Sequence, residues 1–182
     1  MSDDVNEAIM KSVIRNMRVL LKAPDDYTAR SNLMWDSAMA ENGLLKLGKK
    51  TDFQAHMIEH QLGAYTDSNH GQGLAVIHPV YYRHIAREGL PKFVRFAKNV
   101  WDIDGTGKSD TEIALAGIDA LAAFIDECGL PSRLTQLNMK GDAKELLCDR
   151  QLEEIACSTV IQSNSYKKMT CGEIYDILKE CM

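Results

Sequence analysis

The sequence lacks the features that direct a chain to a membrane or to nucleic acid. Its 182 residues contain no apolar run long enough to span a bilayer, and basic residues never stand more than two together. The formal net charge of −5 gives little attraction for phosphate backbones or acidic lipids. Residues 1–4 are acidic where a secretory signal would be basic. We therefore expect a cytoplasmic protein whose partners include neither nucleic acid nor a membrane.

Cysteine is scarce and scattered. The chain has five cysteines, none in a C-x-x-C pair, at positions 128, 148, 157, 171 and 181. An odd number of widely spaced cysteines in a cytoplasmic chain favours reduced, mostly buried thiols over a disulfide framework or a cysteine metal site.

A nucleotide loop is also missing, since no G-x-G-x-x-G or comparable glycine-rich stretch occurs. The segment 102–109 ends in Gly-Lys-Ser, but a phosphate loop needs a glycine where Asp102 stands. As a calcium loop, it would have Ser109 in place of an apolar residue and Ile113 in place of the bidentate glutamate. We interpret 102–109 as a solvated turn.

What the sequence does contain is helical periodicity. The composition, 45% hydrophobic and 26% charged, is that of an ordinary globular protein, and the length suits a single domain over 1–182. Apolar residues recur at spacings of three and four, and no convincing strand pattern appears. We predict an all-α fold, a bundle of about seven or eight helices. The expected helices are 4–22, 26–42, 52–63, 71–82, 92–101, 109–128, 143–156 and 171–180.

Several boundaries follow from capping residues. We expect Asp25 or Asp26 to cap the second helix, and Thr51–Asp52 to cap the third. Thr170 with Glu173 forms a capping box at the last helix. Pro79 should kink the helix 71–82.

Three of the five histidines, His56, His60 and His70, fall within fifteen residues. His56 and His60 are four apart and share one face of a helix, while His70 precedes a glycine at a helix entrance. Neutral imidazoles are the commonest metal ligands, so the cluster is a candidate metal site. Asp52 also has ligand spacing to His56, although its capping role is favoured.

Two chemistries remain open for this cluster. His56, Glu59 and His60 match the H-x-x-E-H pattern, in which both histidines bind zinc and the glutamate activates water. Alternatively, a metal lies between His56 and His70, and His60 carries a proton. Such a metal would favour loss of an alcohol's proton, so that hydride can pass to a nicotinamide.

The pattern around the histidines closely resembles the iron-containing alcohol dehydrogenases, in particular their butanol dehydrogenase branch. The resemblance spans nearly the whole chain, and it is carried by residues 29–35, 42–44, 56–64, 70–79, 117–131 and 167–174. It implies the helical, dehydroquinate synthase-like C-terminal domain of that family. It also implies that His56 and His70 bind divalent iron or zinc, and that His60 lies near the nicotinamide as a proton relay.

Members of this family also carry an NAD(P)-binding α/β half, and a further Asp and His four apart complete their metal site. No histidine precedes His56 here, so we expect two of four ligands and the nucleotide domain to be absent. NAD(P) would bind only if a nucleotide-binding half were supplied by another chain. The implied substrate is a small alcohol or aldehyde, and a homo-oligomer is compatible with the family. We expect no activity from this chain alone; a non-enzymatic helical module or decayed enzyme is the alternative.

Overall fold

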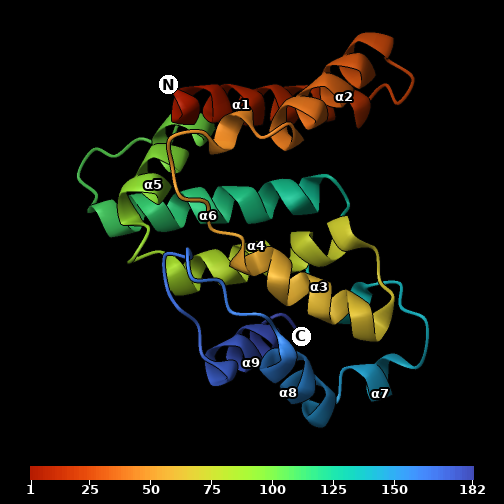
Figure 1. The fold of residues 1–182 in the computed structure, drawn as a ribbon. Coiled ribbons are helices and arrows are strands. Elements are labelled where there is room, and N and C mark those ends of the chain that lie inside the picture. Colours follow the sequence, from red (N-terminus) through yellow and green to blue (C-terminus); the bar gives the residue numbers. More distant parts are fainter. The chain divides into compact units, whose positions relative to one another are not determined.

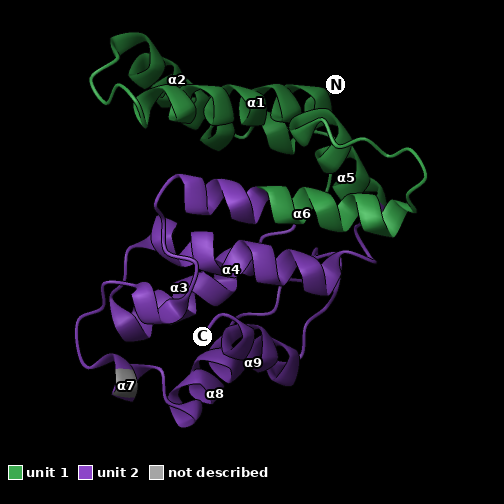
Figure 2. Ribbon diagram, turned by 180° about the vertical axis from the view of Figure 1, so that it is seen from behind, with its two compact units in different colours: residues 1–51, 91–120 green, residues 52–90, 121–182 purple. Residues whose placement is uncertain are grey.

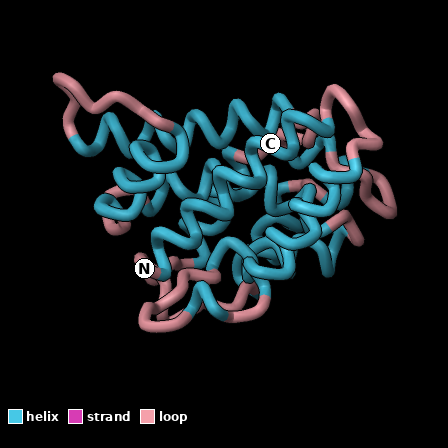
Figure 3. Tube along the Cα trace, turned by 90° about the horizontal axis from the view of Figure 1, so that it is seen from above, coloured by secondary structure: helices cyan, strands magenta, loops and turns pink.

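A computed structural model describes residues 1–182, apart from the side chain of Lys144. The described chain consists of helices joined by loops and contains no strand, which confirms the predicted all-α class (Figure 3). Its α-helices are α1 (Ser2–Leu20), α2 (Tyr27–Glu41), α3 (Gln54–Thr66), α4 (His70–Ile85), α5 (Leu90–Arg95), α6 (Asp110–Glu127), α7 (Ala143–Leu146), α8 (Asp149–Ser158) and α9 (Cys171–Glu180) (Figure 1). No helix in this described chain is long and apolar enough to cross a membrane.

The helices belong to two compact units (Figure 2). Unit 1 comprises residues 1–51 and 91–120, and unit 2 comprises residues 52–90 and 121–182. In unit 1, α1 packs along α2, where the buried Asn16 accepts a hydrogen bond from Asn32 at 3.1 Å. Ion pairs tie the start of α1 to α5, including Arg95 with Glu7 at 2.7 Å.

Unit 2 carries all the histidines and is built around α3 and α4. Helix α3 packs against α4 and α8, and α9 packs against α8 and α4. Apolar residues at helical spacing bury one stripe of each helix in a shared core. Its largest fully buried side chains include Ile58, Leu62, Ile77, Tyr81, Leu152, Ile155, Ile174 and Ile177.

Two of the three predicted helix caps are present in the structure. The Asp26 carboxylate accepts from Ala29 N at 2.8 Å, and Thr170 forms the predicted reciprocal capping box with Glu173. The expected Thr51–Asp52 cap of α3 is corrected, because Phe53 is the N-cap residue and no side chain caps this helix in the usual way.

Asp52 instead ties three segments of unit 2 together. Its carboxylate accepts from Gln54 N at 2.9 Å, from the Tyr81 hydroxyl at 2.9 and 3.0 Å, and from Tyr166 N at 3.1 Å. Gln54 adds two bonds, donating to Val160 O at 3.2 Å and accepting from Gln162 N at 2.7 Å. The start of α3 is therefore held by α4 and by the segment 159–170.

Two predicted helices differ in the structure. The expected helix 143–156 is divided into α7 and α8, because Cys148 between them has extended backbone at φ −68° and ψ 157°. The expected helix 92–101 begins at Leu90 and widens into a π-helical turn, Phe96–Val100. The long helix predicted from Ser109 is present as α6.

The expectation that all cysteines are reduced is also corrected. Cys157 and Cys171 form a disulfide with their Cα atoms 4.7 Å apart, closing the loop between α8 and α9. The two cysteines are 14 residues apart in sequence, so the sequence alone did not indicate that the end of α8 lies beside the start of α9. Cys181 is buried, and burial raises the pKa of its thiol to about 12.

Candidate metal centre

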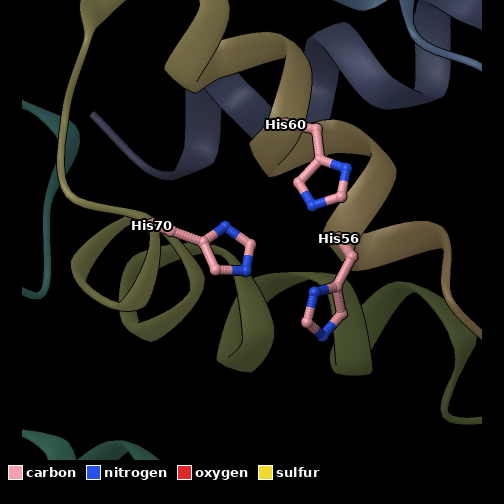
Figure 4. A group of neighbouring side chains, drawn as sticks. All are labelled: His56, His60 and His70. Carbon is pink, nitrogen blue, oxygen red and sulfur yellow. The ribbon is translucent and has the colours of Figure 1, made fainter.

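Helices α3 and α4 bring the three predicted histidines together (Figure 4). His56 and His60 project from α3, and His70 is the first residue of α4. One ring nitrogen from each histidine lies within 4.8 Å of the other two. The imidazole centroids are 5.1 Å apart for His60 and His70, 5.3 Å for His56 and His70, and 6.1 Å for His56 and His60.

A tight turn between the helices makes this convergence possible. Asp67 ends α3 in the left-handed region at φ 50°, and its N–H donates to Gly63 O at 2.7 Å. Two residues later, the Asn69 side chain accepts from Gln72 N at 3.1 Å and starts α4. The chain thus reverses within three residues, and His70 lies next to the helix face that carries His60.

Glu59 lies on the buried side of the cluster. The residue is only 1% exposed, and its Oε2 is hydrogen-bonded to His70 Nδ1. Burial raises the pKa of the Glu59 carboxyl, and the hydrogen bond with His70 opposes that shift. A His70 ring that donates from Nδ1 to this carboxylate carries its lone pair on Nε2.

A glycine on α4 makes room for the carboxyl group. A Cβ at Gly73 would lie 2.7 Å from Glu59 Oε1 and 2.8 Å from its Cγ, both closer than real contacts allow. A Cβ at Gly63 would lie 3.5 Å from the same oxygen. Helix α4 can therefore pack over Glu59 only because position 73 has no side chain.

Aromatic rings lie beside His56. Phe53 stacks on His56 with centroids 4.1 Å apart and planes 6° from parallel. His78 lies 5.9 Å from His56 and stacks on Tyr82 at 5.1 Å. Burial, with the nearby imidazoles of His56 and His70, lowers the pKa of His78 to about 4, so His78 is neutral at pH 7.

The donor set fits a divalent transition metal. Imidazole nitrogens bind zinc at about 2.0–2.1 Å, so two nitrogens on one tetrahedral ion lie roughly 3.3 Å apart. The three ring nitrogens lie within 4.8 Å of one another, which is somewhat wider than that value. Soft or borderline ions such as iron and zinc suit this all-imidazole set better than calcium or magnesium.

Two carboxylates considered at the sequence level, Glu59 and Asp52, are engaged in other contacts in the structure. Glu59 was a candidate water activator, but Oε1 lies against the glycines and Oε2 is hydrogen-bonded to His70. Asp52 has the spacing of a ligand, but its carboxylate is hydrogen-bonded to Tyr81 and Tyr166. Neither carboxylate belongs to the group of side chains that could hold a metal ion, which consists of His56, His60 and His70.

Sequence reasoning missed the contact of Glu59 with His70 and the role of Gly73. One signal was available. Ala55, Ile58 and Leu62 define the buried face of α3, and helical geometry places Glu59 on that same face. A carboxylate on a core face requires a buried partner.

An all-helical fold that gathers three imidazoles between two helices defines a helical domain with a candidate metal site. Comparison with known proteins then gives its family. The model of the Fe-containing alcohol dehydrogenase family, C-terminal, matches residues 1–182, and the chain belongs to that family.

Similar proteins agree with this assignment. The chain is 39% identical to NADH-dependent butanol dehydrogenase A of Clostridium acetobutylicum over 179 residues, 98% of this chain and 45% of that protein. It is 32% identical to the NADPH-dependent aldehyde reductase YqhD of Escherichia coli, over 96% of this chain and 44% of that protein. The crystal structure of NADH-dependent butanol dehydrogenase A from Thermotoga maritima superposes with a TM-score of 0.84 at 27% identity, covering 99% of this chain and 46% of that one.

The chain therefore spans a little under half the length of the relatives it matches. The resemblance to the C-terminal part of iron-containing alcohol dehydrogenases, and the helical fold that it implied, are confirmed.

Proposed function

We propose that this chain is the metal-binding helical domain of an NAD(P)-dependent oxidoreductase that interconverts small alcohols and aldehydes. The observation that carries the proposal is the convergence of His56, His60 and His70 between α3 and α4. Family membership supports it, as do relatives described as a butanol dehydrogenase and an aldehyde reductase.

The three imidazoles have different roles in this proposal. His56 and His70 hold a divalent iron or zinc ion, His70 through Nε2 because Nδ1 donates to Glu59. When bound, the ion supplies a positive charge that favours loss of the proton from an alcohol hydroxyl. His60 is exposed, so its ring nitrogen can accept that proton and return it to water.

The hydride acceptor in this proposal is NAD(P), which residues 1–182 do not bind by themselves. The sequence carries no glycine-rich nucleotide loop, so we assign NAD(P) binding to a separate nucleotide-binding half. Two imidazoles also hold a divalent ion more weakly than a complete four-ligand set. The proposal therefore expects residues 1–182 to act as one metal-binding domain that turns over substrate only when completed.

The zinc hydrolase alternative is disfavoured by the position of Glu59. A water-activating carboxylate has to face the open side of the metal. Glu59 is only 1% exposed, and one of its oxygens is hydrogen-bonded to His70 Nδ1. It therefore lies on the buried side of His70, a proposed metal ligand, and does not face the open side of the metal.

A chimera tests this function. The chain replaces the matching region of the Clostridium acetobutylicum butanol dehydrogenase, to which it is 39% identical, and NADH oxidation with butanal is measured with added iron or zinc. We expect turnover by the chimera and none by the chain alone. His60→Ala should lower kcat about 100-fold or more while metal content is retained.

The variants His56→Ala and His70→Ala should instead lose the metal, measured by elemental analysis, together with the activity. A folded, metal-loaded chimera with no turnover of any short alcohol or aldehyde would contradict the proposal.

A further inference from the structure

We propose that Glu59 is a positioning residue of the metal centre, which fixes the tautomer and orientation of His70 from behind. This inference rests on the proposed metal site, and it assigns Glu59 a role in place of the water activation that its sequence pattern suggested.

The first support is the burial of the carboxyl group. Glu59 is 1% exposed although it lies one residue before the exposed His60. Burying a carboxylate is costly unless it is hydrogen-bonded, so such a group is retained where its bond has a use. Here the bond joins α3 to the first residue of α4, through Oε2 and His70 Nδ1.

The second support is the chemistry of the bonded atom. An imidazole that donates from Nδ1 keeps its lone pair on Nε2, the nitrogen at the opposite edge of the ring. The His70 side chain is 50% exposed, so one edge meets Glu59 while the rest of the ring remains accessible. A carboxylate behind a metal-binding histidine both orients the ring and makes it a better donor.

The third support is that α4 has a glycine where its backbone passes over this carboxyl group. A Cβ at Gly73 would meet Oε1 and Cγ of Glu59 at 2.7 and 2.8 Å. By contrast, a Cβ at Gly71, two residues earlier in α4, would meet only Asn69 Oδ1, at an ordinary 3.5 Å. Only Gly73 makes room for Glu59, so Gly71 is a suitable control position for substitutions at Gly73.

The test measures the tautomer of His70 directly. The chain is labelled with ¹⁵N-histidine, and long-range ¹H–¹⁵N spectra of the metal-free protein are recorded at about pH 8, above the ordinary histidine pKa of about 6.5. We expect His70 to carry its proton on Nδ1. Glu59→Gln should keep this tautomer, because the amide oxygen still accepts, whereas Glu59→Leu should shift the proton to Nε2.

Zinc affinity is the second readout. Glu59→Leu should bind zinc about 10- to 100-fold more weakly than the unaltered chain, the usual effect of losing such a partner, and Glu59→Gln should lose less. Gly73→Ala should reproduce the Glu59→Leu result by displacing the carboxyl group. Gly71→Ala should match the unaltered chain, and circular dichroism confirms that each variant is folded.

The positioning role and the proposed function fail in different ways. If Glu59→Leu and Gly73→Ala leave both the His70 tautomer and zinc affinity unchanged, the positioning role is wrong even where zinc binding depends on His56 and His70. If the tautomer responds as expected but the chimera turns over no alcohol or aldehyde, the role of Glu59 stands and the proposed function fails.

Discussion

The carboxylates of the two units differ in the groups that they are paired with. In unit 1, three acidic side chains at the start of α1 face lysine and arginine. The pairs are Asp3 with Lys49 and Lys92, Asp4 with Arg95, and Glu7 with Arg95. In unit 2, the buried Glu59 is hydrogen-bonded to an imidazole.

The pKa shifts of the two regions have opposite signs. Hydrogen bonds from Lys92 and Lys49 lower the pKa of Asp3, and those from the N-terminus and Arg95 lower that of Asp4. Burial raises the pKa of Glu59. A carboxylate that meets a permanent cation at the surface adds modest stability. A carboxyl group buried against a histidine adds little electrostatic stability to the fold. We therefore assign Glu59 the role of orienting the His70 ring.

The largest expected effect is the loss of stability when the disulfide of unit 2 is removed. Only unit 2 has a disulfide in the described chain, and it joins residues 14 apart in sequence. Replacing Cys157 and Cys171 by serine should lower the free energy of unfolding by about 3 kcal/mol, the usual effect for a loop of this length. Hydrogen exchange should rise over residues 159–170, while α1 and α2 keep their protection. Equal loss of protection in both units would contradict the prediction that the disulfide stabilises unit 2 alone.

A smaller effect is expected from overpacking one glycine in each unit. In unit 1, a Cβ at Gly117 would lie 2.7 Å from Ala97 Cβ, as tight as the Gly73 contact with Glu59. Gly117→Ala and Gly73→Ala should each cost about 1–3 kcal/mol in chemical denaturation. Only Gly73→Ala should weaken zinc binding in calorimetry. Weakened zinc binding in both variants would mean that loss of stability, rather than displacement of Glu59, is responsible.

The smallest effect belongs to the surface ion pairs. Because the folded pKa of Asp3 is below the ordinary 3.8, its contribution is complete above that pH and is lost as the pH falls below it. Asp3→Asn should cost about 1 kcal/mol or less at neutral pH and should flatten the acid limb of the stability curve. Zinc affinity should not change. A cost that persists at 1 M salt would argue against a screened surface interaction.

Much of this structure could be predicted from local sequence signals. Capping by Asp26 and Thr170, and the start of a helix at His70, follow from side chains that act within three residues. The i, i+4 spacing of His56 and His60 fixes their shared face. The resemblance to a family then supplied the roles of the three histidines, which stay predictions.

What could not be predicted depends on contacts between helices. The Cys157–Cys171 bond requires the end of α8 to meet the start of α9, and the space at Gly73 exists only where α4 crosses Glu59. Asp52 looked like a helix cap because its partners Tyr81 and Tyr166 are distant in sequence. The division of 143–156 depends on one extended residue, Cys148.

The most direct measurement is anomalous diffraction at the zinc edge from crystals of this chain soaked in zinc. We predict one ion between α3 and α4, about 2.0–2.1 Å from His70 Nε2 and from a ring nitrogen of His56. The Glu59 carboxylate should remain on His70 Nδ1. An ion bound through His70 Nδ1, with Glu59 displaced or itself a ligand, would contradict the account.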